Sequence, residues 1–248
     1  MRTYRVLVVM LARSALREPV GLFFSLIFAP MLVIILGLFF GNDPTPQFGG
    51  QGFVDAVLPA CSCLVVAMTG VLLLPVTQLQ LRESGALARL RATPLRQGIY
   101  VAADLSVNFL ISMAGVILAL AAGMLGFGAT LRGNPLLVVA AVALGLVAFL
   151  ALGYTLAAVL PSSRAATGIG NGLFIVLMLS SGAFIPTAEL PASVQRIMGY
   201  SPFYYLVDLV RGLWGGEPWS HYGPATAVLA GMAMILGALG ARLFTWST

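Results

Sequence analysis

Long runs of apolar residues without a charged side chain dominate this sequence of 248 residues. A helix needs about 20 mostly apolar residues to cross the roughly 30 Å hydrocarbon core of a bilayer. Six stretches meet this length, and barrel strands are excluded because apolar and polar residues do not alternate along them. The sequence therefore predicts an all-α polytopic membrane protein that forms a single transmembrane domain over residues 1–248. The predicted spans are residues 21–40, 56–79, 105–127, 136–160, 166–186 and 224–246.

The composition excludes several functional classes. Only 8% of the residues are charged, against about 25% in soluble proteins. All thirteen basic residues are arginines, so the chain lacks the lysine that a P-loop ATPase or a Schiff-base enzyme requires. One histidine and two cysteines make a metal site improbable, and a nucleic-acid binder would need a basic solvated face. We therefore expect a chain that is no enzyme, has no cofactor of its own and binds membrane lipid rather than nucleic acid.

The placement of the arginines predicts the orientation, because cytoplasmic loops of membrane proteins retain an excess of positive charge. With the N-terminus inside, ten of the thirteen arginines lie on the cytoplasmic side, and only Arg132, Arg196 and Arg211 lie outside. This bias predicts a multi-pass protein of the cell membrane with both termini in the cytoplasm.

Residues 1–20 form a predicted interfacial helix. At about 100° per residue, four arginines share one third of the helix circumference and four other residues lie opposite. Such a helix can lie in the headgroup layer with its arginines directed to water. A short cytoplasmic lead-in and a cleaved signal peptide are the alternatives, although the apolar run 6–12 is short for a signal sequence. The arginines are Arg2, Arg5, Arg13 and Arg17, and the opposite face holds Tyr4, Leu7, Leu11 and Ala15.

The inner loop, residues 80–97, contains a second amphipathic segment. Leu87 and Leu90 share one helical face, Arg89 and Arg91 point elsewhere, and Pro94 ends the helix. The pattern fits a docking surface for a cytoplasmic partner, with leucines that insert. It fits an ordinary solvated loop equally well.

The outer stretch, residues 187–223, predicts a helical loop that re-enters the outer leaflet. Ser201 and Pro202 have the form of an N-cap followed by proline at the first helical position. Asp208 and Arg211 are three residues apart and could pair. Apolar residues then repeat at helical spacing, and aromatic residues are expected at the membrane interface. The apolar repeat is Leu206, Leu209, Val210 and Leu213, and the aromatics are Phe203, Tyr204, Tyr205, Trp214 and Trp219.

Some polar and small residues inside the spans have two interpretations. Asp104, near the inner end of the third span, is either functional, or it pairs with Arg96 or reaches water, and we favour the second interpretation. Gly168 and Gly172 have the spacing that lets helices approach closely, which suits a protomer or helix interface, although flexibility at a helix start also explains them.

The inner segment 82–95 and the outer segments 181–186, 190–191, 201–202 and 208–212 together resemble a known family. They are similar to the membrane subunits of type-2 ABC exporters, the daunorubicin-resistance-like permeases, and the resemblance covers nearly the whole chain. It implies a homo- or heterodimer of permeases with two copies of a separate cytoplasmic ATPase, which would bind the ATP and Mg²⁺.

The resemblance also implies roles for individual residues. A coupling surface for the ATPase would lie on the inner loop, although Ala86 and Ala88 replace residues that are often polar in the family. An outer loop and gate would close the far side, and a substrate cavity between protomers would be lined by the second and fifth spans. The coupling residues are Arg82, Glu83, Gly85, Leu87, Leu90, Arg91 and Pro94. The gate residues are Pro186, Pro191, Ser201, Pro202, Tyr204, Asp208 and Arg211, and the cavity residues are Met68, Asn171, Phe174 and Met178.

The expected function is the ATP-driven export of a hydrophobic or amphipathic small molecule, such as a drug, an antibiotic or a lipid-like compound. Export of a lipid-linked glycan or another lipid is the first alternative, and the spans offer it few aromatic stacking faces. An ion-coupled carrier is the second, for which only Asp104 is a candidate membrane acid.

Overall fold

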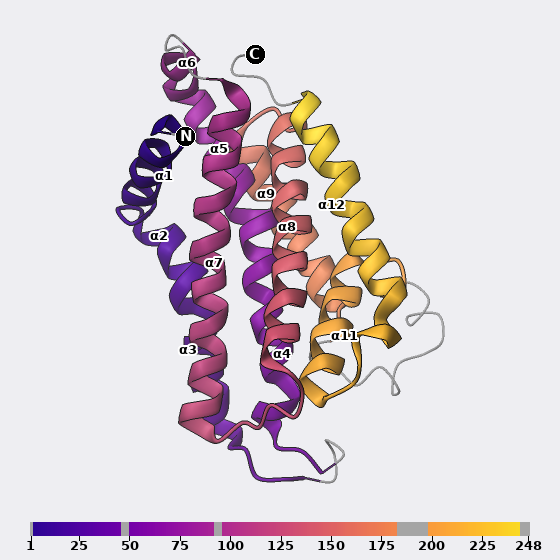
Figure 1. Ribbon diagram of the computed structural model, residues 1–248. Coiled ribbons are helices and arrows are strands. Elements are labelled where there is room, and N and C mark those ends of the chain that lie inside the picture. The colour runs from indigo at the N-terminus through magenta and orange to yellow at the C-terminus, as the bar shows by residue number, and fades with distance from the viewer. Residues whose placement is uncertain (1, 46–49, 92–95, 183–197, 244–248) are drawn as a thin grey trace.

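The computed structural model describes residues 2–45, 50–91, 96–182 and 198–243, and these residues form a bundle of helices (Figure 1). In chain order, the elements are α1 (Arg2–Ala15), α2 (Pro19–Leu22), the π-helix η1 (Phe23–Ile27), α3 (Phe28–Phe40), α4 (Phe53–Ala67), the π-helix η3 (Met68–Leu73), α5 (Leu74–Glu83), α6 (Ala86–Arg91), α7 (Gln97–Phe127), α8 (Pro135–Val159), α9 (Ser163–Leu179), α11 (Pro202–Gly215), the 3₁₀ helix η5 (Trp219–Tyr222) and α12 (Gly223–Leu243).

Within the described residues, five helical segments are long and apolar enough to cross a membrane. They correspond to the first four predicted spans and the last, which confirms an all-helical, multi-pass membrane protein. The second and third segments extend beyond the predicted bounds, over Phe53–Glu83 and Gln97–Phe127. The predicted fifth span is represented by α9, whose 17 residues cover about 26 Å. Its expected outer end, residues 183–186, lies outside the described residues, so the count of six spans stays a prediction.

Local sequence signals explain where several helices begin and end. The Asn134 side chain accepts a hydrogen bond from the backbone N–H of Leu136 at 2.9 Å and so caps α8. Ser162 caps α9 in the same way, through the N–H of Ala165. Gly85 has a φ of 70°. This backbone conformation is unfavourable for any residue that has a Cβ atom, so the glycine allows the chain to turn from α5 into α6.

The continuous helix α4–η3–α5 lies at the centre of the bundle and is almost entirely buried. At Gly70 the neighbouring helix α8 comes so close that a Cβ atom would lie 2.4 Å from the Phe149 carbonyl oxygen. Gly153 on α8 reciprocates, since its Cβ would lie 2.4 Å from the carbonyl oxygen of Gly70. These two glycines therefore set the spacing between the central helix and α8.

The apolar face of α1 packs against the protein. Leu7 is buried and Leu11 is partly buried, whereas Val6, Val9 and Met10 are exposed. The hydroxyl groups of Tyr4 and Ser106, on α7, lie 2.7 Å apart. The predicted amphipathic helix exists, and α7 covers the leucines that lie opposite the arginines; its position in a headgroup layer stays a prediction.

The stretch predicted to form an outer loop contains a helix, α11, that packs into the core against α4, α8 and α12. Its leucine repeat is buried as the spacing predicts. The prediction that all of its aromatics lie at the interface is wrong, because Phe203 and Trp214 are buried. The Phe203 ring meets the ring of Phe149 edge to face, with centroids 5.9 Å apart.

The bundle has two distinguishable ends (Figure 1). One carries α6, the end of α5, the start of α7, the turn from α8 to α9 and the C-terminal end of α12, and α1 lies beside it. We call this the basic end, because exposed arginines gather there. They are Arg5 and Arg13 on α1, Arg89 on α6, Arg96 before α7, Arg164 on α9 and Arg242 on α12.

Candidate functional site

A buried carboxylate joins three helices near the basic end. Asp104 of α7 is only 7% exposed, and its Oδ2 atom accepts hydrogen bonds from Gln78 Nε2 of α5 at 3.0 Å and from the Tyr154 hydroxyl of α8 at 2.5 Å. The Tyr100 hydroxyl donates to Gln78 Oε1 at 3.2 Å. The expectation that Asp104 reaches water or pairs with Arg96 is therefore wrong. A buried charged or polar group is costly unless such partners satisfy it, so this network requires α5, α7 and α8 to stay together.

Leu87 of α6 packs into the same region and is only 1% exposed. It belongs to a cluster with Leu74, Tyr100, Leu150 and Tyr154, against which Leu90 is partly buried. The interpretation that both leucines insert into a partner is therefore wrong for Leu87, which attaches α6 to its own chain. Among the described side chains of α6, those of Ala88 and Arg89 are exposed instead.

Arg82 and Glu83, at the end of α5, hold the turn between α8 and α9. Arg82 Nη2 donates to the carbonyl oxygens of Leu160 at 2.9 Å and Pro161 at 3.4 Å. The Glu83 carboxylate accepts from the Ser163 backbone N–H at 2.7 Å and from its hydroxyl at 2.6 Å. Because Ser163 is the first residue of α9, a displacement of the inner loop would act directly on the start of that helix.

The basic end therefore contains one connected assembly, which we call the basic-end assembly: the ends of α5 and α8, the start of α7, helix α6 and the start of α9. Leu11 of α1 packs against the cluster that holds Leu87, so the N-terminal helix also contacts it. Of the predicted coupling residues, Pro94 and the side chain of Arg91 lie outside what the structure describes. Gly85 serves as the turn between α5 and α6.

The predicted outer gate residues are only partly brought together. Ser201 is the N-cap of α11 and Pro202 its first residue, but the Ser201 hydroxyl accepts a hydrogen bond from Ser180 at 2.8 Å and does not bond within the helix. Arg211 donates to the Gly182 carbonyl oxygen at 3.4 and 3.5 Å. These contacts tie α11 to the end of α9. Pro186 and Pro191 lie outside the described residues.

Asp208 and Arg211, both on α11, influence each other's pKa. Burial raises the pKa of Asp208 above its ordinary value, and the positive charge of Arg211 opposes that shift. Tyr204 is partly buried beside Tyr205, with the two ring centroids 5.8 Å apart.

The four predicted cavity residues do not share one surface. Met68 is buried in the central helix at 5% exposure, whereas Asn171 on α9 is exposed. Phe174 and Met178 are partly buried against the core. The two glycines expected at an interface face outward: no described atom lies within 4 Å of a Cβ placed at Gly168 or Gly172.

Close packing inside the chain uses a different glycine of α9. A Cβ at Gly170 would lie 2.8 Å from the Val71 carbonyl oxygen, so Gly170 is the position where α9 meets the central helix. Four further polar residues of the site were not predicted from the sequence. Gln78 and Tyr154 bond Asp104, Tyr100 bonds Gln78, and Ser163 bonds Glu83. Polar side chains in apolar helices were the available signal for the first three.

Two comparisons with known proteins show the family of this chain. The family model for ABC-2 type transporters matches residues 2–214. The chain is also 29% identical over 166 residues to a Bacillus subtilis (strain 168) protein named "Putative transport permease YvfS", and the match covers 62% of this chain and 63% of that protein. The matched part thus spans less than two thirds of this relative. The match to the family model covers most of the chain, from α1 through α11, and the chain belongs to the ABC-2 type transporter family as a membrane permease subunit.

Proposed function

We propose that this chain is the permease subunit of an ATP-driven exporter of a hydrophobic or amphipathic small molecule. A separate cytoplasmic ATPase, in two copies, would bind ATP and Mg²⁺ and dock on the basic end. The chain would lie in the cell membrane with this end on the cytoplasmic side. The observation that carries this proposal is the basic-end assembly. A displacement of the short helix α6 would be transmitted through direct contacts to four longer helices, α5, α7, α8 and α9.

The two faces of α6 have different roles in the proposed coupling. Leu87 anchors the helix over the buried cluster, while Ala88 and Arg89 are exposed to a partner. From α6 the displacement passes through Gly85 to Arg82 and Glu83, which hold the α8–α9 turn. The ATPase stroke would thus move α5 and the start of α9 together.

The outward face of α9 suits a second permease protomer. Gly168 and Gly172 lie on it with Ile175 and Leu179, which are 52% and 69% exposed. Small residues at this spacing let a partner helix approach closely. In the proposed dimer, Asn171 on the same face would contribute a polar group to the space between protomers.

Transport by reconstituted protein tests the proposal. The full chain, purified with its ATPase, is placed in vesicles loaded with a fluorescent amphipathic cation, and ATP-dependent release is compared between wild type and Arg89→Glu. The control is Arg132→Glu, an exposed arginine at the opposite end of the bundle. We expect Arg89→Glu to lose both ATPase binding and release, with Arg132→Glu unaffected.

Two results would contradict the proposal. The first is normal binding and release by Arg89→Glu, which would remove α6 as the docking helix. The second is transport that ignores ATP and collapses when an ionophore dissipates the ion gradient, which would establish an ion-coupled carrier.

A further inference from the structure

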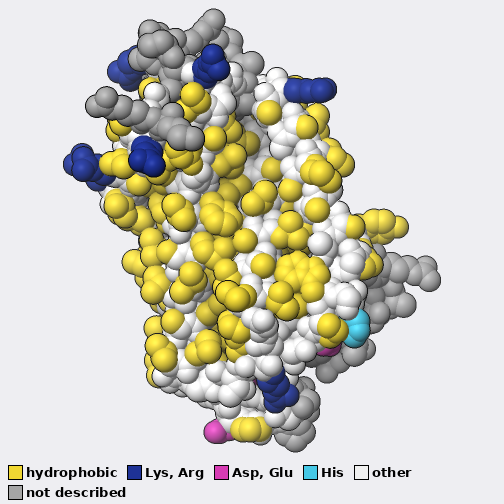
Figure 2. All heavy atoms as spheres, in the orientation of Figure 1, with side chains coloured by type: hydrophobic (Ala, Val, Ile, Leu, Met, Phe, Trp, Pro, Cys, Tyr) yellow, Lys and Arg dark blue, Asp and Glu magenta, His cyan; other side chains and the backbone are white. Residues whose placement is uncertain are grey.

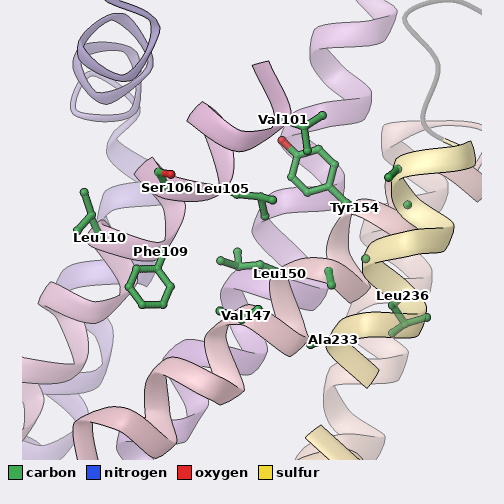
Figure 3. A pocket seen from close by; sticks show the side chains of 14 residues that line it. Val101, Leu105, Ser106, Phe109, Leu110, Val147, Leu150, Tyr154, Ala233 and Leu236 are labelled. Carbon is green, nitrogen blue, oxygen red and sulfur yellow. The ribbon is translucent and has the colours of Figure 1, made fainter. Parts of the chain in front are cut away.

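A groove of about 640 Å³ opens on the side of the bundle between α7, α8 and α12. Figure 3 shows side chains from these three helices around it, among them Leu105, Phe109, Val147 and Leu150. On the α12 side, the groove is lined largely by small residues at helical spacing, which leave space between this helix and α7 and α8. Those residues are Ala233, Gly237, Gly240 and Ala241.

Among the described residues that line the groove, no hydroxyl group is free to compete with an apolar ligand. Ser106 and Tyr154 are the hydroxyl-bearing side chains that line it, and both hydroxyls already have partners within the chain. Tyr154 donates to Asp104, and Ser106 bonds the Ala102 carbonyl oxygen and the Tyr4 hydroxyl. A hydrocarbon chain can therefore fill the groove without leaving a buried polar group unsatisfied.

The length of the groove matches one leaflet. Along α7 its lining runs from Val101 to Leu110, which is about 14 Å at 1.5 Å per residue. That is close to half of the roughly 30 Å hydrocarbon core. All three walls are helices long and apolar enough to cross a membrane, so the groove opens toward lipid.

Arginines stand at one end of the groove. Arg242 directly follows Ala241 of the lining, and Arg96 lies five residues before Val101, about 7.5 Å further toward the basic end. Both side chains are exposed. Figure 2 shows this face of the molecule: hydrophobic and uncharged side chains cover its middle, and most of its basic side chains lie at the upper end.

We propose that the groove is a binding site for an anionic glycerophospholipid. One acyl chain lies between α7, α8 and α12, and the phosphate lies at the basic end, near Arg96 and Arg242. Basic groups at the end of an apolar cleft between membrane helices match the two parts of such a lipid. The site is separate from α6 and from the outward face of α9, so it does not depend on the proposed function.

Native mass spectrometry of the full chain tests this site. The detergent-purified protein is titrated with phosphatidylglycerol, and with phosphatidylcholine of the same acyl chains. The groove is filled by Gly237→Leu, whose new side chain has no described atom within 4 Å of its Cβ. The matched control is Gly231→Leu, which lies on the same helix outside the groove and has equally open space. Val147→Trp fills the groove from α8 and serves if Gly237→Leu does not fold.

The charge requirement is tested separately. Arg96→Gln and Arg242→Gln should each weaken phosphatidylglycerol binding by about fivefold, the contribution of one basic side chain near an anionic lipid. Arg132→Gln, at the opposite end, should leave binding unchanged.

The expected result is at least one phosphatidylglycerol retained by wild type and Gly231→Leu, and lost from both groove-filling variants. Equal retention of phosphatidylcholine, or retention of phosphatidylglycerol by folded groove-filling variants, would overturn the proposal. Loss of transport in the groove-filling variants with lipid retention intact would also overturn it, because it would assign the groove to the transported molecule.

Discussion

Replacing Tyr154 by phenylalanine isolates the contribution of the buried network to stability. The tyrosine side chain is only 3% exposed, and its hydroxyl donates to Asp104 at 2.5 Å. The substitution keeps the ring in the leucine cluster and removes one donor from a buried carboxylate, which retains Gln78. Loss of a hydrogen bond to a charged group costs about 1.5–3 kcal/mol. At about 2–4 °C per kcal/mol for a chain of this size, the midpoint of unfolding should fall by about 3–12 °C.

The chain carries its own reporter for this measurement. Cys61 and Cys63 are free and buried in the central helix, so a thiol-reactive fluorogenic dye reports their exposure as the protein unfolds. The matched control is Tyr4→Phe, which removes a hydroxyl that contacts Ser106 at an exposed position. An exposed contact of this kind contributes little, so the Tyr4→Phe midpoint should stay near that of wild type.

The comparison between the two variants shows whether the carboxylate network stabilises the bundle. If Tyr154→Phe and Tyr4→Phe unfold at the same temperature, the carboxylate network does not hold α5, α7 and α8 together. The route from α6 to the long helices would then rest on apolar packing alone.

Three further predictions concern helix packing and the proposed docking surfaces. Gly70→Leu should prevent folding, seen as a loss of monodisperse protein in gel filtration, because even a Cβ would meet the Phe149 carbonyl oxygen. Gly98→Leu should fold normally, because a Cβ at position 98 has open space around it among the described residues. Gly168→Leu should leave the unfolding midpoint unchanged and lower the fraction of dimer in chemical cross-linking, and an unchanged dimer fraction would remove α9 as the interface. Cys61 should resist maleimide in the folded protein and react on denaturation, and rapid labelling of the native state would contradict the central position of α4.

The fold could be predicted from the sequence where the physical signal is local. Uninterrupted apolar length identified the five long helices, and Ser201 and Pro202 marked the start of α11. The sequence did not reveal that the second apolar helix is enclosed by its neighbours, because an apolar residue facing lipid and one facing protein look alike. For the same reason, Met68 was placed on a cavity although it is buried in the core.

The sequence indicated the correct segment for the candidate site, the inner loop, but not the contacts that its residues make. The amphipathic pattern of the inner loop showed which face of α6 is apolar, but it could not show whether a partner or the chain itself covers Leu87. Likewise, the charge of Asp104 was visible, whereas its partners come from residues 26 and 50 positions away. Such pairings depend on how helices pack, and helix spacing in the sequence does not encode them.

The ratio of substrate released to ATP hydrolysed by the Glu83→Gln variant tests the central claim most directly. Among the described residues, the Glu83 carboxylate bonds Ser163 and lies outside the exposed Ala88 and Arg89 of α6, the proposed docking helix. The variant should therefore bind its ATPase and hydrolyse ATP as wild type does. In vesicles, with Glu217→Gln as the control for an exposed carboxylate elsewhere, we predict continued hydrolysis and a release-to-ATP ratio several-fold below that of wild type. An unchanged ratio would contradict the claim that the basic-end assembly carries the ATPase stroke into the membrane helices.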